Sequence, residues 1–175
     1  MATIGSDNAD KSEDADNPKE GHNPIGVYTQ GYFETRLKQD PNRAKVWGYL
    51  ADYFRRFVPS DGRVLELGAG WCDFANSVHA GSVVAMDLDA TVQQAAAPHV
   101  KAVVGDCTDL SAFDDSSFDV VFASNLLEHL PRPASDRLLA ESARVLAPGG
   151  KLILMQPNFR LQPGRYFDDF THVSI

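Results

Sequence analysis

Side chains able to bind the hydroxyl groups of a ligand follow three apolar runs of the sequence. Asp87, Asp106 and Asn125 each stand at the end of such a run, where a carboxylate or an amide can accept hydrogen bonds. Asp87 also follows Gly70 by seventeen positions, about the separation at which an acid binds both hydroxyls of a ribose. The three residues together predict a site for a ligand that contains a ribose.

Gly68 and Gly70 directly follow a further apolar run, which precedes these three in the sequence. Without side chains the backbone can turn tightly there, and a ligand can approach the amide groups at the start of the next helix. The glycine loop and the three polar residues therefore indicate one nucleoside site.

An alternation of short strands and helices must position these residues. We expect strands over residues 63–70 (running into the glycine loop), 82–89, 100–106, 118–125 and 151–157. We expect helices over residues 46–57, 73–79, 91–97 (capped by Thr91) and 134–146. This pattern predicts an α/β fold, a doubly wound Rossmann-like parallel sheet with helices on both faces. Because ligands of such sheets bind at the carboxyl ends of the strands, the glycines and the polar residues should meet at one edge.

The composition is that of a globular protein with a buried core. The chain has 175 residues, of which 43% are hydrophobic and 23% charged, enough for one domain of ordinary size. The formal net charge of -8 opposes binding to a nucleic-acid backbone. Cys72 and Cys107 are far apart and form no C-x-x-C pattern, which argues against a disulfide framework or a structural zinc site. With neither a leader pattern nor an apolar run near the roughly 18 residues of a membrane span, we expect a cytoplasmic protein.

The chain divides into three parts by composition. Residues 1–24 carry six acids, two lysines and almost no large apolar side chains, which predicts a disordered acidic tail. Residues 25–60 form a helical preface whose second half bears an aromatic stripe. Residues 61–175 form the ligand-binding domain.

Two features argue against a phosphate-bearing nucleotide as the ligand. No G-K-[ST] follows the glycines, which excludes a P-loop. The NAD fingerprint requires glycine or alanine where Asp73 stands, and Glu66 would place a carboxylate near a pyrophosphate. A ligand with ribose, adenine and an ammonium group, but without phosphate, suits these acids better.

The stretches VLELGAGWCDFA, VVAMDLD, GDCTDL, FDVVFASNLLEHL and LAPGGKLIL resemble, in order and spacing, the motifs of class I S-adenosylmethionine-dependent methyltransferases that act on small molecules. The resemblance covers roughly residues 46–157 and implies S-adenosylmethionine as cofactor. Its implied cofactor-binding residues, assigned by position in these motifs, are Glu66, Gly68, Ala69, Gly70 and Trp71 at the methionine end, Asp87 and Leu88 at the ribose, Asp106 and Cys107 at the adenine, and Asn125 and Leu126 beside the sulfonium.

The resemblance implies methyl transfer to a small-molecule, sugar or lipid-conjugate acceptor, with O-methylation favoured and no metal required. His129 and His172 are the candidate catalytic residues, because either could take a proton from the acceptor. Two alternatives remain open: an NAD-type oxidoreductase or epimerase, and a non-catalytic cofactor-binding module.

Only eighteen residues follow the fifth expected strand, whereas the family fold continues with a further helix and two more strands. The resemblance therefore implies that residues 61–175 lack the C-terminal strands, leaving residues 151–157 as an edge strand. Unpaired backbone groups on such an edge invite pairing with another chain. We expect either a fragment of a longer protein or a homo-oligomer joined through this edge.

Overall fold

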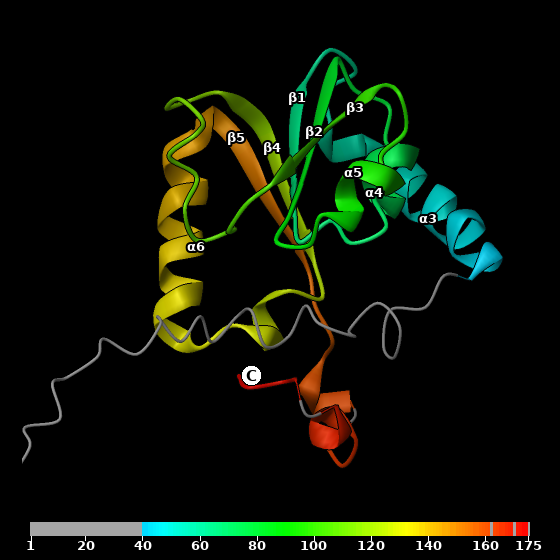
Figure 1. The fold of residues 1–175 in the computed structure, drawn as a ribbon, viewed down its shortest axis with the longest axis vertical. Helices are drawn as coiled ribbons and strands as arrows, with labels where there is room; N and C mark the ends of the chain where they lie inside the picture. The colour runs from blue at the N-terminus through cyan, green and yellow to red at the C-terminus, as the bar shows by residue number, and fades with distance from the viewer. Residues whose placement is uncertain (1–39, 162, 170, 175) are drawn as a thin grey trace, which may run out of the picture.

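A computed structural model describes residues 40–161, 163–169 and 171–174. Its centre is a five-stranded sheet in the order β3-β2-β1-β4-β5, with all neighbouring strands parallel (Figure 1). The strands are β1 (Arg63–Leu67), β2 (Ser82–Asp87), β3 (Val100–Val104), β4 (Phe118–Ser124) and β5 (Leu146–Met155). The predicted α/β class and the five predicted strands are confirmed.

Helices cover both faces of the sheet, with α3, α4 and α5 on one side and α6 on the other (Figure 1). The longer helices are α3 (Pro41–Phe54) and α6 (Arg132–Val145), and the short ones are α4 (Asp73–Ser77) and α5 (Thr91–Ala95). Single turns of 3-10 helix are η1 (Arg55–Phe57), η2 (Leu127–His129), η3 (Phe159–Leu161) and η4 (Tyr166–Asp168). The architecture is therefore doubly wound, as predicted.

Alternation along the strands separates the apolar core into two layers. Val64 of β1 faces α3 and α4, in a layer where the rings of Phe74 and Phe122 stack 3.8 Å apart. Leu65 belongs to the opposite layer, which includes Leu138 of α6. Successive strand residues point to opposite faces, so nearly continuous apolar runs fill both layers.

Several predicted boundaries shift in the structure. The first helix begins at Pro41 rather than at residue 46, because the carboxylate of Asp40 accepts a hydrogen bond from the Asn42 amide (2.8 Å) and caps it. The last strand begins at Leu146 rather than at residue 151, since a register shift between Phe118 and Val120 extends its pairing with β4. The predicted tail, residues 1–24, and the preface up to residue 39 lie outside the described residues.

The predicted cap of α5 is wrong. Thr91 is the first residue of the helix, and its amide donates to the carboxylate of Asp89 (2.8 Å). An aspartate two residues earlier thus satisfies the amide that a capping threonine would have satisfied.

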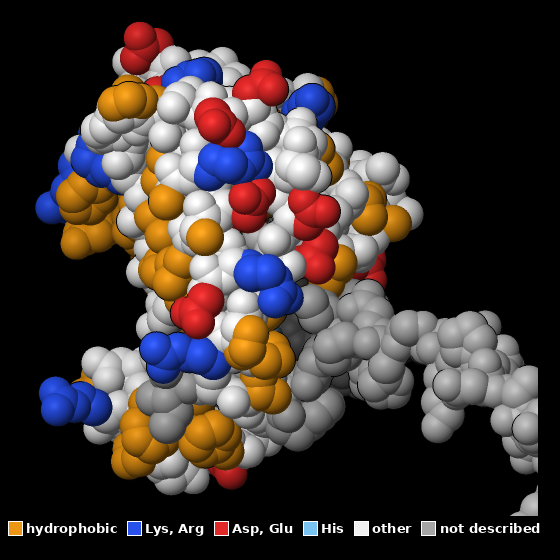
Figure 2. Space-filling view, turned by 90° about the vertical axis from the view of Figure 1, so that its left-hand side faces the viewer, with side chains coloured by type: hydrophobic (Ala, Val, Ile, Leu, Met, Phe, Trp, Pro, Cys, Tyr) orange, Lys and Arg blue, Asp and Glu red, His pale blue; other side chains and the backbone are white. Residues whose placement is uncertain are grey.

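The face covered by α6 presents acidic and basic side chains interspersed with one another (Figure 2). Arg144 of α6 pairs with Glu141 (2.7 Å) and with Asp115 (2.8 Å). No helix in the described ranges is both long enough and apolar enough to cross a membrane.

Candidate functional site

The sheet winds in opposite directions from its central pair, β1 and β4. From β1 the chain proceeds to β2 and β3 on one side, and from β4 to β5 on the other. The carboxyl ends of β1 and β4 therefore form the point where ligands of doubly wound sheets bind. In Figure 1 these ends lie at the lower edge of the sheet, toward η2 and the C-terminal segment.

The loop after β1 has a backbone that favours glycine. Gly68 and Gly70 have φ angles of +65° and +53°, and Cys72 also adopts the left-handed region at +56°. A Cβ atom on Gly68 would lie 2.9 Å from Cδ1 of Leu126, so the loop closely approaches the residues after β4. Ala69 anchors the loop to β2, since its amide donates to the Met86 carbonyl oxygen (3.0 Å).

Asp87 lies at the end of β2 with its carboxylate fixed by backbone amides. Its Oδ2 accepts from the Gly70 amide (2.8 Å), and its Oδ1 from the Asp89 amide (2.9 Å). Burial raises the pKa of this carboxyl, and hydrogen bonds from the backbone amides of Asp89, Gly70 and Leu88 partly oppose that shift. A carboxylate offers about four lone-pair sites, so these amides still leave a site that can accept a hydrogen bond from a hydroxyl. This arrangement fits the predicted contact with a ribose.

Glu66 is buried inside β1, with 4% of its surface exposed. Its Oε2 accepts a hydrogen bond from the Ala75 amide of α4 (2.9 Å) and so joins that helix to the strand. Burial raises the pKa of Glu66 to about 8. Its predicted contact with the methionine end of a cofactor stays a prediction.

The residues after β3 are arranged as a tight turn. The carboxylate of Asp106 accepts from the Thr108 amide (2.8 Å), and Cys107 is buried. Burial raises the pKa of the Cys107 thiol to about 12, so it remains protonated at neutral pH. Leu88 is half-buried beside the end of β2, and Trp71 in the glycine loop is also partly exposed.

The residues after β4 face the same edge of the sheet. Asn125 is exposed and adopts a positive φ of +48°, and its amide donates to the Met155 carbonyl oxygen of β5 (2.9 Å). Leu126 is half-buried against Gly68. The structure thus brings together the glycine loop, Asp87 and the start of the segment after β4, as the sequence predicts.

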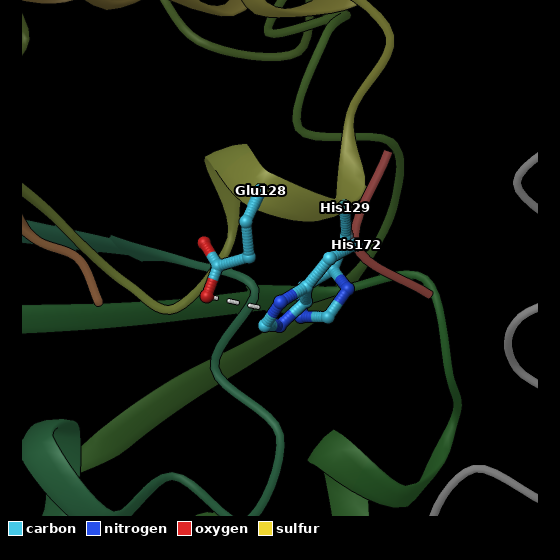
Figure 3. Close-up of side chains that lie close together, drawn as sticks. All are labelled: Glu128, His129 and His172. Atoms are coloured by element: carbon cyan, nitrogen blue, oxygen red, sulfur yellow. Dashed lines mark ion pairs between the residues drawn. The ribbon is translucent and has the colours of Figure 1, made fainter. Parts of the chain in front are cut away.

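His129 and His172 meet although 43 positions separate them (Figure 3). Their ring centroids lie 5.0 Å apart in an edge-on arrangement, and Nε2 of His129 lies 3.9 Å from Oε1 of Glu128. Burial lowers the pKa of His129, which favours the neutral imidazole. Glu128 is not among the residues predicted from the sequence, where its only signal is its place directly before His129.

The charges at this edge suit a cationic ligand. The loops that follow β1 to β4, residues 68–72, 88–90, 105–117 and 125–131, contain no lysine or arginine. They carry several acids, Asp89 and Asp106 among them, and Asp87 ends β2 directly before the second of these loops. A diphosphate would find no cationic partner in these loops, whereas a sulfonium or an ammonium group would be stabilised there. The site therefore fits S-adenosylmethionine better than NAD.

Comparison with known proteins agrees with this assignment. Residues 65–154 match the family model described as a methyltransferase domain. The chain is 33% identical over 112 residues to a ubiquinone biosynthesis O-methyltransferase of Xanthomonas axonopodis pv. citri, covering 59% of this chain and 46% of the relative. It is 35% identical over 148 residues to the phthiotriol/phenolphthiotriol dimycocerosates methyltransferase of Mycobacterium leprae, covering 78% and 52%.

The fold is shared with solved structures as well. The crystal structure of a SAM-dependent methyltransferase from Archaeoglobus fulgidus aligns with a TM-score of 0.67 at 19% identity, covering 85% of this chain and 67% of that one. The fold is therefore the Rossmann-like fold of methyltransferases. More particularly, the chain belongs to the methyltransferase domain family, whose cofactor is S-adenosylmethionine. It spans about half the length of the curated relatives it matches.

Proposed function

We propose that this protein transfers the methyl group of S-adenosylmethionine to a hydroxyl oxygen of a small or lipid-conjugated acceptor. The observation that carries the proposal is the amide-fixed carboxylate of Asp87 beside a loop shaped by Gly68 and Gly70. The preference for an oxygen acceptor rests on the relatives named as ubiquinone biosynthesis O-methyltransferases, and the lipid-conjugated acceptor is suggested by the relative named as a dimycocerosates methyltransferase.

The cofactor would be held by residues at the ends of three strands. Asp87 would accept hydrogen bonds from the ribose hydroxyls, while Asp106 and Cys107 would lie at the adenine. Asn125 and Leu126 would line the site beside the sulfonium. When bound, S-adenosylmethionine supplies an electrophilic methyl group whose transfer leaves a neutral thioether.

The protein's share of the chemistry is orientation and removal of one proton. Holding an acceptor oxygen in line with the methyl group can contribute on the order of 7–11 kcal/mol to lowering the barrier. A hydroxyl must also lose its proton. His129 and His172 are the candidates to accept it, because they lie in the segments that follow the carboxyl ends of β4 and β5. The neutral form of His129, favoured by its burial, is the form that can accept a proton at Nε2.

Methyl transfer from labelled S-adenosylmethionine to separated polar and lipid fractions of a cell extract tests the proposal. We expect label in a phenolic, sugar or lipid product, and loss of labelling when Asp87 is replaced by alanine. Labelled methyl groups found on nitrogen or carbon atoms of the product would contradict the assignment of an oxygen acceptor. Cofactor binding without labelling of any fraction would favour a non-catalytic module.

A further inference from the structure

The segment after β4 and the C-terminal segment bring three potential metal ligands together. Glu128, His129 and His172 each offer one ligand atom, and these atoms all lie within 4.8 Å of one another (Figure 3). Glu128 and His129 belong to η2, and His172 follows η4. Bonds from a zinc ion to such ligands are about 2.0–2.2 Å long. To bind one ion, the three ligand atoms would therefore have to approach one another by about 1 Å.

The histidine rings are held in the manner of metal ligands. Nδ1 of His129 lies 3.1 Å from the carbonyl oxygen of Thr171, and Nδ1 of His172 lies 2.6 Å from that of Tyr166. A carbonyl oxygen only accepts hydrogen bonds, so each Nδ1 carries the proton and each neutral ring has its lone pair at Nε2. Metal-binding histidines commonly make this second hydrogen bond, which fixes the tautomer and the ring orientation.

The buried carboxylate of Glu128 is an independent observation in favour of a bound cation. Only 4% of its surface is exposed, and its Oε2 is buried without a hydrogen-bond partner among the described residues. Leaving a carboxylate oxygen buried and unsatisfied is costly, and buried charges are usually paired or bound to a metal. A cation between Glu128 and the two imidazoles would satisfy this oxygen.

The surrounding backbone holds the cluster in place. The Glu128 carbonyl oxygen accepts from the Val173 amide (2.7 Å), and the Ser174 hydroxyl donates to the Leu127 carbonyl oxygen (2.9 Å). The Tyr166 hydroxyl donates to the Ser174 carbonyl oxygen (2.9 Å). These contacts fasten the segment that carries His172 to η2, so the three ligands converge before any ion binds.

We propose that Glu128, His129 and His172 bind one divalent transition-metal ion, with Zn²⁺ as the reference ion, at the acceptor side of the cofactor site. Two imidazoles and one carboxylate leave a coordination position open, as in catalytic zinc sites. Resting on the proposed function, we assign that position to the acceptor hydroxyl, whose oxygen would bind the ion and lose its proton to solvent. The two histidines then act as ligands rather than as the bases that the sequence indicates.

Calorimetric titration of the chelator-treated 175-residue chain with Zn²⁺, together with the visible absorption of Co²⁺ added in its place, tests the site. We expect one ion per chain and a Co²⁺ spectrum of four or five ligands. Glu128→Gln and His172→Ala should each weaken Zn²⁺ binding by at least about tenfold. The control variant His99→Ala, at an exposed histidine outside the cluster, should bind as the parent does.

S-adenosylhomocysteine binding, measured on the same preparations, separates this site from the proposed function. The variants should retain it, because the glycine loop and Asp87 are unaltered. Absence of saturable Zn²⁺ binding by the parent, or parental affinity in both variants, would overturn the metal site even if methyl transfer were observed. Stoichiometric Zn²⁺ binding lost in the variants would support the site even if no methyl transfer occurred.

Discussion

Glu66 is the residue at which burial and charge conflict most directly. Its carboxyl is enclosed in β1 and its pKa is raised to about 8, whereas in the unfolded chain it titrates near 4.3. Between these values the folded protein holds a proton that the unfolded chain releases. The contribution of Glu66 to the free energy of unfolding is therefore greatest below about pH 4 and is lost as the pH rises toward 8.

We expect Glu66→Gln to flatten this pH dependence, because the amide cannot ionise and its oxygen can still accept from the Ala75 amide. Urea unfolding at intervals from pH 4 to 8 measures the difference between variant and parent, at most about 1.4 kcal/mol per pH unit.

Glu141→Gln is the control. Arg144 lowers the pKa of Glu141, so the contribution of Glu141 to the free energy of unfolding is lost only as the pH falls below the ordinary pKa of a glutamate. Parallel curves for Glu66→Gln and the parent would show that Glu66 is ionised in the folded protein.

Individual site residues could be predicted from the sequence only where one pattern carries the signal. Asp87 follows the glycine loop at a characteristic separation, so its position at the end of β2 was predictable. Glu128 was not predictable, because its proposed role as a metal ligand depends on His172, 44 positions away and brought near by the fold. The fixing of α5 by Asp89 rather than Thr91 was missed for a local reason, since either side chain can satisfy the first amides of a helix.

At the scale of elements, the connection between β1 and α4 is the loop that we propose binds the cofactor. Gly68 combines a positive φ with a close approach to Leu126. We expect Gly68→Ala to weaken S-adenosylhomocysteine binding roughly tenfold while the domain stays folded, because the methyl group must displace the Leu126 side chain or shift the loop.

Gly149→Ala is a matched control, since Gly149 also has a positive φ (+81°) but has no atom within 4 Å of an added Cβ. Both variants should lose a similar amount of stability to backbone strain, about 1–2 kcal/mol. Titration calorimetry compares S-adenosylhomocysteine binding by the two variants, and circular dichroism shows whether each is folded. Equal cofactor binding by the two variants would show that the loop after β1 does not hold the ligand.

The order of elements was predictable because each strand is a short, nearly continuous apolar run. The ends of the elements were less predictable. A 3-10 turn follows Phe54 where the sequence predicts a helix that continues to residue 57, and β5 includes Gly149 and Gly150, which lie before the predicted start of that strand at residue 151. These boundaries depend on capping and on pairing with β4, which the apolar pattern does not encode.

At the scale of the whole molecule, β5 is the last strand of the sheet in the described residues. Leu154 on this strand is 38% exposed, and no strand of the described part pairs with its outer side. Edge strands with apolar side chains pair readily with other chains. We expect the 175-residue chain to self-associate through β5, with sedimentation velocity showing a concentration-dependent dimer.

Leu154→Lys should shift that equilibrium toward monomer, because a charge on an edge strand opposes pairing. It is a cleaner probe than Ile153→Lys, since Ile153 packs against the core layer under α3. Exposed Leu139 on α6 offers the control Leu139→Lys, which should leave association unchanged. A parent that sediments as a monomer at all concentrations would refute the edge contact.

Cofactor selectivity is the property on which the whole assignment depends. Titration calorimetry of the chain with S-adenosylhomocysteine and with NAD⁺ measures it, with Asp87→Ala and the exposed control Asp114→Ala beside the parent. We predict one S-adenosylhomocysteine per chain, no saturable NAD⁺ binding, and an affinity loss of roughly 1.5–3 kcal/mol in Asp87→Ala alone, the cost of losing hydrogen bonds to a charged group. Saturable NAD⁺ binding without S-adenosylhomocysteine binding, or an Asp87→Ala variant that binds as tightly as the parent, would contradict the account.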